Sequence, residues 1–106
     1  MRKVPERFTK FIQDYPEVGR SYTSLGKAAA GAGPLEVKTQ LLVKLGIAIA
    51  ADLEGGAHSA ARKALDAGCS PEELRHTAIL AVTTLGFPSM MKGLSWVDDV
   101  IEGDSK

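Results

Sequence analysis

The chain has 106 residues, 44% of them hydrophobic, which suits one domain with a small core. Thirteen basic side chains balance thirteen acidic ones, and this lack of basic surplus excludes a typical nucleic-acid binder. A single cysteine excludes an internal disulfide. The longest apolar run, Leu41–Ala51, is about half a membrane span, and the N-terminus lacks the pattern of a secretory signal. We therefore expect a cytoplasmic protein that binds neither nucleic acid nor membrane.

Helical spacing of apolar residues runs through the first half of the chain. Arg7–Tyr15 predicts a short helix, and a second, weaker helix is expected over residues 16–30. The Gly31–Pro34 segment is the clearest break in the chain. A third helix is predicted from about residue 36 to 53. It is apolar nearly all round, which is typical of a helix buried on most sides.

The second half begins with an expected polar turn that holds Glu54, Gly55, Gly56 and His58. A fourth helix, Ser59–Ala67, follows this turn and is closed by a glycine cap. The motif Ser-Pro-Glu-Glu at residues 70–73 then predicts a capped helix that runs to Leu85. A last helix, from Ser89 to about residue 101, follows a turn, and residues 102–106 form a polar tail.

No segment alternates in the manner of a strand, so the fold class is all-α, a bundle of about six helices. We expect one domain over residues 1–106, with N-terminal helices in 1–33 and the core in 34–101. The third helix needs apolar partners on nearly every side, which short helices of one small chain can hardly supply. An exposed apolar patch of this kind marks an interface, so we expect a homo-oligomer.

The order of signals in residues 34–101 resembles the carboxymuconolactone decarboxylase family, which also contains the alkylhydroperoxidase D-like proteins. The residues that carry the resemblance are LEVKT at 35–39, AARKAL at 60–65, DAGCSPEEL at 66–74, TTLGFP at 83–88 and LSWVDDV at 94–100. The resemblance implies an all-α helical bundle, assembled as a dimer, trimer or hexamer. It also implies a decarboxylase-like lyase, if the protein is an enzyme.

The chain departs from this family at the reactive positions. Peroxidase-type relatives carry C-x-x-C-x-x-x-H after the turn and a glutamate in the long helix. These four positions fall on Leu41, Leu53, Gly56 and Ala60 here. A dithiol peroxidase needs one thiolate to attack and a second to resolve, so this activity is disfavoured. The decarboxylase branch usually keeps the histidine that is replaced by Ala60.

His58 is the first candidate for chemistry in place of the missing residues. It lies four residues after Glu54 and four before Arg62, so the three share one helix face. In one interpretation the Glu54 carboxylate orients an imidazole that acts as acid or base. In the other, both side chains belong to a solvated first helical turn, with Glu54 favoured by the helix dipole. A two-glycine turn would also let backbone amides approach an anion.

Lys44 is the second candidate, because it is flanked by Val43, Leu45 and Ile47. A lysine in such surroundings must reach water, pair with a carboxylate or bind an anionic ligand. His76 is typical of an exposed or interface histidine, and the lone Cys69 has no evident basic neighbour.

A metal site is not predicted either. Glu54 and His58 have the spacing of a metal-binding pair, but no third or fourth ligand is evident in the sequence. We therefore predict no metal and no other cofactor.

These candidates lead to three hypotheses. In the first, the protein is a lyase acting on a small carboxylated compound: Lys44 holds the negative charge, His58 supplies a proton and Glu54 orients His58. In the second, it is a thiol-less relative of alkylhydroperoxidase D, kept as a non-enzymatic binding or scaffold oligomer. In the third, it is a purely structural oligomer in which Lys44 and Glu54 form an interface ion pair.

Overall fold

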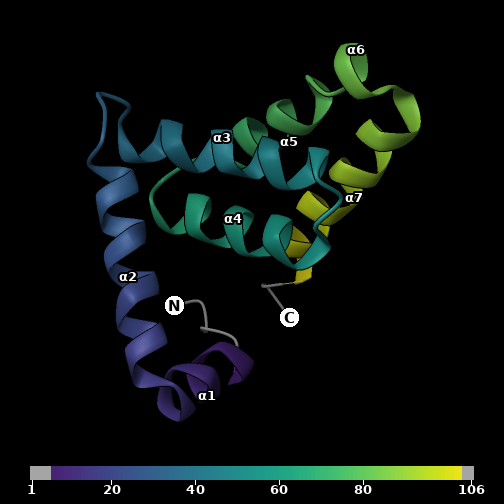
Figure 1. The fold of residues 1–106 in the computed structure, drawn as a ribbon. Coiled ribbons are helices and arrows are strands. Elements are labelled where there is room, and N and C mark those ends of the chain that lie inside the picture. The colour runs from purple at the N-terminus through teal and green to yellow at the C-terminus, as the bar shows by residue number, and fades with distance from the viewer. Residues whose placement is uncertain (1–5, 104–106) are drawn as a thin grey trace. The chain divides into compact units, whose positions relative to one another are not determined.

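The structure is a computed structural model, and it describes residues 6–103 (Figure 1). The helices are α1 (Glu6–Asp14), α2 (Pro16–Ala30), α3 (Val37–Ala50), α4 (Glu54–Asp66), α5 (Pro71–Ile79), α6 (Val82–Leu85) and α7 (Phe87–Gly103). Within this described range there is no strand, so the prediction of an all-α fold is confirmed. No helix in this range is long and apolar enough to cross a membrane.

The chain divides into two compact units between Leu35 and Glu36. In the first unit, α1 and α2 pack against each other where Gly19 is buried. A Cβ built on Gly19 would lie 3.1 Å from Ile12 Cγ2, so the two helices approach closely there. The rings of Phe8 and Tyr22 also meet edge to face, with centroids 6.1 Å apart. The contact between α1 and α2 is therefore partly aromatic.

The second unit is built around α3 and α4, which lie side by side (Figure 1). Helix α7 packs against both α4 and α5. The core of this unit is made of small and aliphatic residues of these four helices, together with Cys69 between α4 and α5: Leu45, Ala48, Ile49, Ala57, Ala60, Ala61, Ala64, Cys69, Leu74, Ala78, Val97 and Val100. The many alanines let the helices approach one another closely.

The turn between α3 and α4 differs from the prediction. Helix α4 begins at Glu54 rather than Ser59, so the expected polar turn over Glu54–His58 is wrong. The chain reverses earlier, where Asp52 has a positive φ of 63° and the Leu53 N–H donates to the Ala48 carbonyl at 2.9 Å. Each glycine in a helix costs about 1 kcal/mol relative to alanine. Two effects offset that cost. The alanine face of α4 is buried, and the Glu54 carboxylate lies at the positive end of the helix dipole.

The predicted single helix over residues 71–85 is divided into α5 and α6. The Ala81 N–H donates to the Ala78 carbonyl and the Thr84 N–H to the Ala81 carbonyl, each at 3.1 Å. These bonds span three residues rather than four, so the backbone tightens there and the α-helical pattern is interrupted. After α6 the chain turns at Gly86, whose φ is 98°, and α7 begins two residues before the predicted Ser89.

Packing against the other helices accounts for only part of the apolar pattern of α3. Leu45, Ala48 and Ile49 are buried against the other helices of the unit. Val43 and Ile47, on the other side of the helix, are exposed in the single chain. The second unit by itself therefore covers one face of α3 and leaves its other, apolar face uncovered.

Candidate functional site

The candidate site lies where α7 crosses α4. The side of α4 that faces the core carries only small residues, among them Ala57 and Ala61, which are fully buried. On α7, Val97 and Val100 are buried in the same core. Because Val97 and Val100 point inward, the intervening Asp98 and Asp99 lie toward the edges of the contact. This packing places Asp99 beside α4.

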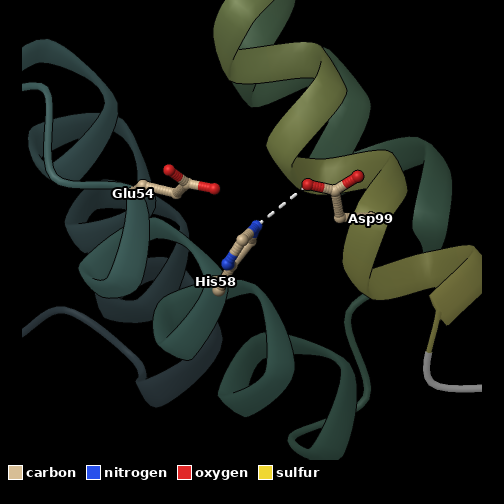
Figure 2. Close-up of side chains that lie close together, drawn as sticks. All are labelled: Glu54, His58 and Asp99. Atoms are coloured by element: carbon tan, nitrogen blue, oxygen red, sulfur yellow. Dashed lines mark hydrogen bonds and ion pairs between the residues drawn. The ribbon is translucent and has the colours of Figure 1, made fainter.

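Three side chains meet at this crossing (Figure 2). His58 Nε2 lies 3.1 Å from Asp99 Oδ2, across 41 residues of sequence. Glu54, one helical turn before His58, directs its carboxylate into the same space. One ligand atom from each of Glu54, His58 and Asp99 lies within 4.8 Å of the other two. The imidazole is thus placed between two carboxylates from different helices.

The burial of these groups differs. The side chain of His58 is 23% exposed, whereas that of Asp99 is 58% exposed. The imidazole is therefore held at the protein surface with most of its ring covered, while the carboxylates remain open to solvent. Its hydrogen bond to Asp99 fixes the orientation of the ring, as a carboxylate commonly does for a histidine that transfers protons or binds metal.

The sequence-predicted residues are only partly brought together. Glu54 and His58 belong to one cluster, which their four-residue spacing indicated. Lys44 is exposed on α3, and no hydrogen bond or ion pair joins its side chain to another of residues 6–103. Asp99 was not predicted, because nothing in the sequence connects a residue of the last helix with His58.

The remaining cysteine lies apart from this cluster. Cys69 is 4% exposed, after the end of α4, and its Sγ lies 3.9 Å from the Lys38 carbonyl oxygen. Burial raises the pKa of the Cys69 thiol, the nearby Glu73 carboxylate raises this pKa further, and Lys38 partly opposes both. A covered thiol with a raised pKa is a poor nucleophile at neutral pH.

Comparison with known proteins places the chain in a family. The sequence profile of the carboxymuconolactone decarboxylase family matches residues 16–99. The chain belongs to the carboxymuconolactone decarboxylase family. This result confirms the resemblance inferred from the sequence. No curated protein sequence matches the chain.

A solved member of the carboxymuconolactone decarboxylase family shares the fold. It comes from Legionella pneumophila, and its crystal structure was determined in the apo form. The two chains are 29% identical and superpose with a TM-score of 0.79. The match covers 94% of the present chain and 88% of the Legionella chain.

The positions that the sequence resemblance assigns to the reactive groups of thiol-bearing relatives carry aliphatic residues or glycine in this chain. Leu41 is half-buried, Ala60 is buried, and Leu53 and Gly56 are exposed. Since the chain has one cysteine, a cysteine pair is absent from the whole sequence. The polar groups of the candidate site are Glu54 and His58 of α4 and Asp99 of α7.

Proposed function

We propose that this protein is a carboxymuconolactone decarboxylase-like lyase that acts on a small carboxylated compound at His58. The hydrogen bond between His58 Nε2 and Asp99 carries the proposal, because it holds an imidazole in a fixed orientation at an open surface. The Glu54 carboxylate lies within 4.8 Å of the same imidazole and of Asp99. An oriented imidazole exchanges protons readily near neutral pH.

The proposed step is the loss of carbon dioxide followed by protonation. The bond between the substrate carbon and its carboxylate breaks, and the electron pair stays on that carbon. Protonated His58 then donates the proton on Nε2 to this carbon, and solvent restores the proton. In the absence of substrate, His58 Nε2 faces Asp99 Oδ2.

Lys44 lies outside the cluster of Glu54, His58 and Asp99 in the single chain, and in this proposal a homo-oligomer brings it to the site, where it holds the substrate carboxylate. The two carboxylates beside His58 repel an anionic substrate, so the reaction needs a positive charge near the reacting carbon. Lys44 stands on the exposed apolar face of α3, beside Val43 and Ile47. A homo-oligomer that covers this face would remove Lys44 from water and strengthen its attraction for a carboxylate.

The test measures carbon dioxide release from a set of small carboxylic acids, beginning with carboxylated lactones, in the presence of a chelator. His58→Ala should abolish release from any substrate found, while His76→Ala, which changes the other histidine, should leave it intact. Lys44→Met should raise KM more than it lowers kcat, whereas Lys63→Met on the exposed side of α4 should change neither. Full activity of His58→Ala would remove the imidazole from the mechanism.

A second function is favoured by the aliphatic residues at the family's reactive positions. In this alternative, the protein is a thiol-less relative of alkylhydroperoxidase D that serves as a binding or scaffold oligomer. Exposed apolar side chains such as Ile47, Leu80 and Phe87 would then belong to contacts between copies. Light scattering should show an oligomer, and Ile47→Glu should dissociate it. An oligomer that Ile47→Glu dissociates, together with no carbon dioxide release from the unmodified chain, would favour the scaffold function over the lyase.

A further inference from the structure

We propose that Glu54, His58 and Asp99 form a binding site for a divalent transition-metal ion. The donor set consists of one imidazole nitrogen and two carboxylates, contributed by α4 and α7 (Figure 2). The sequence offered only Glu54 and His58, spaced by four residues, and no third ligand. The packing of α7 on α4 supplies that ligand in Asp99.

The geometry fits a metal with modest side-chain adjustment. Metal–ligand bonds of about 2.1 Å place neighbouring ligand atoms roughly 3.0 to 3.5 Å apart. His58 Nε2 and Asp99 Oδ2, at 3.1 Å, already have this separation. The Glu54 carboxylate lies within 4.8 Å of both and is on an exposed side chain with several rotatable bonds. A change of Glu54 rotamer closes the site without movement of the backbone.

The charge at the site is an independent argument for a cation. Two neighbouring carboxylates of the second unit have cationic partners: Asp98 is paired with Arg75, and Asp52 with Lys92. Among residues 6–103, neither Glu54 nor Asp99 is paired with a lysine or arginine, and His58 is the group they share. Two carboxylates close to one imidazole form a concentrated negative charge that a divalent ion would neutralise.

The mixture of donors indicates the class of metal. Imidazole suits zinc, copper, iron and nickel, whereas an all-oxygen site suits magnesium and calcium. A site with one nitrogen and two carboxylates therefore prefers Zn²⁺ or a similar transition-metal ion to Mg²⁺. Three protein ligands leave at least one coordination position for water or for a ligand oxygen.

This inference goes beyond the proposed function and stands apart from it. A metal on His58 Nε2 takes the position of the proton that the lyase mechanism transfers. The lyase assay contains a chelator, and the metal assay contains no substrate. Either proposal can therefore fail while the other holds.

The experiment titrates ZnCl₂ into the purified full-length chain, free of any histidine tag, and follows binding by calorimetry. We expect one Zn²⁺ per chain, with affinity reduced by about tenfold or more in Asp99→Asn and in Glu54→Gln. His58→Gln should lose binding altogether. NMR signals of the His58 ring should shift on addition of Zn²⁺, while those of His76 should not. Mg²⁺ at the same concentration should neither bind comparably nor shift the His58 ring.

Matched controls separate this site from general binding to an acidic surface. Asp98→Asn removes the neighbouring carboxylate and His76→Ala the other histidine, and both should bind Zn²⁺ as the unmodified chain does. Cys69→Ala should also retain binding, which excludes the thiol as the ligand. Circular dichroism verifies that every variant is folded. The inference is overturned if the unmodified chain binds no Zn²⁺, if His58→Gln retains binding, or if His76→Ala loses it.

Discussion

Gly93 of α7 lies directly against the side chain of Ile49 in α3. A Cβ built on Gly93 would be 2.8 Å from Ile49 Cγ2 and 3.0 Å from Ile49 Cδ1. Such distances are shorter than any ordinary carbon–carbon contact, and Ile49 is itself 2% exposed. The absence of a side chain at position 93 therefore sets how closely α7 approaches α3.

Gly93→Ala should lower the free energy of unfolding by about 1 to 3 kcal/mol, the usual cost of overpacking a core. Ile49 cannot relieve the clash easily, because a β-branched side chain has little rotational freedom in a helix. Urea unfolding at a fixed protein concentration measures the change. Gly46→Ala is the control, since its Cβ would meet Thr77 Cγ2 at 3.8 Å, an ordinary contact.

The clash also predicts that shortening the Ile49 side chain reduces the cost of Gly93→Ala. Ile49→Ala alone destabilises the core by opening a cavity, but it removes the atoms that a Gly93 side chain would meet. Gly93→Ala should therefore cost less in the Ile49→Ala background than in the original chain, a non-additivity expected of residues in contact. Additive costs would contradict the close approach of the two helices.

The start of α5 depends on Ser70. Its Oγ accepts a hydrogen bond from the Glu73 N–H at 3.0 Å, and the Ser70 N–H donates to Glu73 Oε1 at 2.8 Å. Ser70→Ala should reduce stability by about 1 kcal/mol, because the N-terminal amides of α5 lose a partner. Ser95→Ala provides the comparison. The Ser95 hydroxyl donates within α7 to the Lys92 carbonyl, so its loss should change stability by less than about 0.5 kcal/mol.

The ion pair between Arg75 and Asp98 joins α5 to α7. Arg75 Nε lies 2.9 Å from Asp98 Oδ1, and the two side chains are 36% and 37% exposed. A double-mutant cycle with Arg75→Gln and Asp98→Asn should give a coupling of about 1 kcal/mol or less, since partly exposed pairs are screened by solvent. The coupling should decrease as salt is added. A coupling that is insensitive to salt would indicate packing rather than charge.

The buried Cys69 predicts slow thiol chemistry. Because burial and Glu73 raise the pKa of this thiol, its thiolate fraction at neutral pH is below that of a free cysteine. Iodoacetamide should modify the folded chain much more slowly than the urea-unfolded chain at the same pH. The rate for the folded chain should still be rising at pH values above the ordinary thiol pKa of 9.0. Mass spectrometry follows both reactions.

The same raised pKa predicts how stability changes with pH. In the unfolded chain the thiol loses its proton near its ordinary pKa of 9.0, whereas the folded chain retains it to higher pH. The contribution of Cys69 is therefore present below pH 9.0 and is lost as the pH rises toward the raised folded-state pKa. The free energy of unfolding should fall more steeply above pH 9.0 in the original chain than in Cys69→Ala. Parallel curves would show that Cys69 does not contribute.

Most of the helices were predictable because their signals are local. Apolar residues at spacings of three and four, and breaks rich in glycine and proline, depend only on nearby residues. The capped start of α5 at Ser70 is of this kind, and the prediction there is confirmed. The start of α4 was misplaced because Gly55 and Gly56 indicate a turn locally, while burial of the alanine face, a tertiary effect, keeps them helical.

Only part of the candidate site could be predicted, because only part of it depends on local sequence spacing. Glu54 and His58 lie one helical turn apart, so their sequence spacing alone places them on one face. Asp99 joins them only because two valines of α7 are buried against the small residues of α4, a contact between segments 41 residues apart. Sequence by itself determined the all-α class, the family and the pair Glu54 and His58. The tertiary structure decided the position of Asp99, because a hydrogen bond between distant helices exists only after the core has packed.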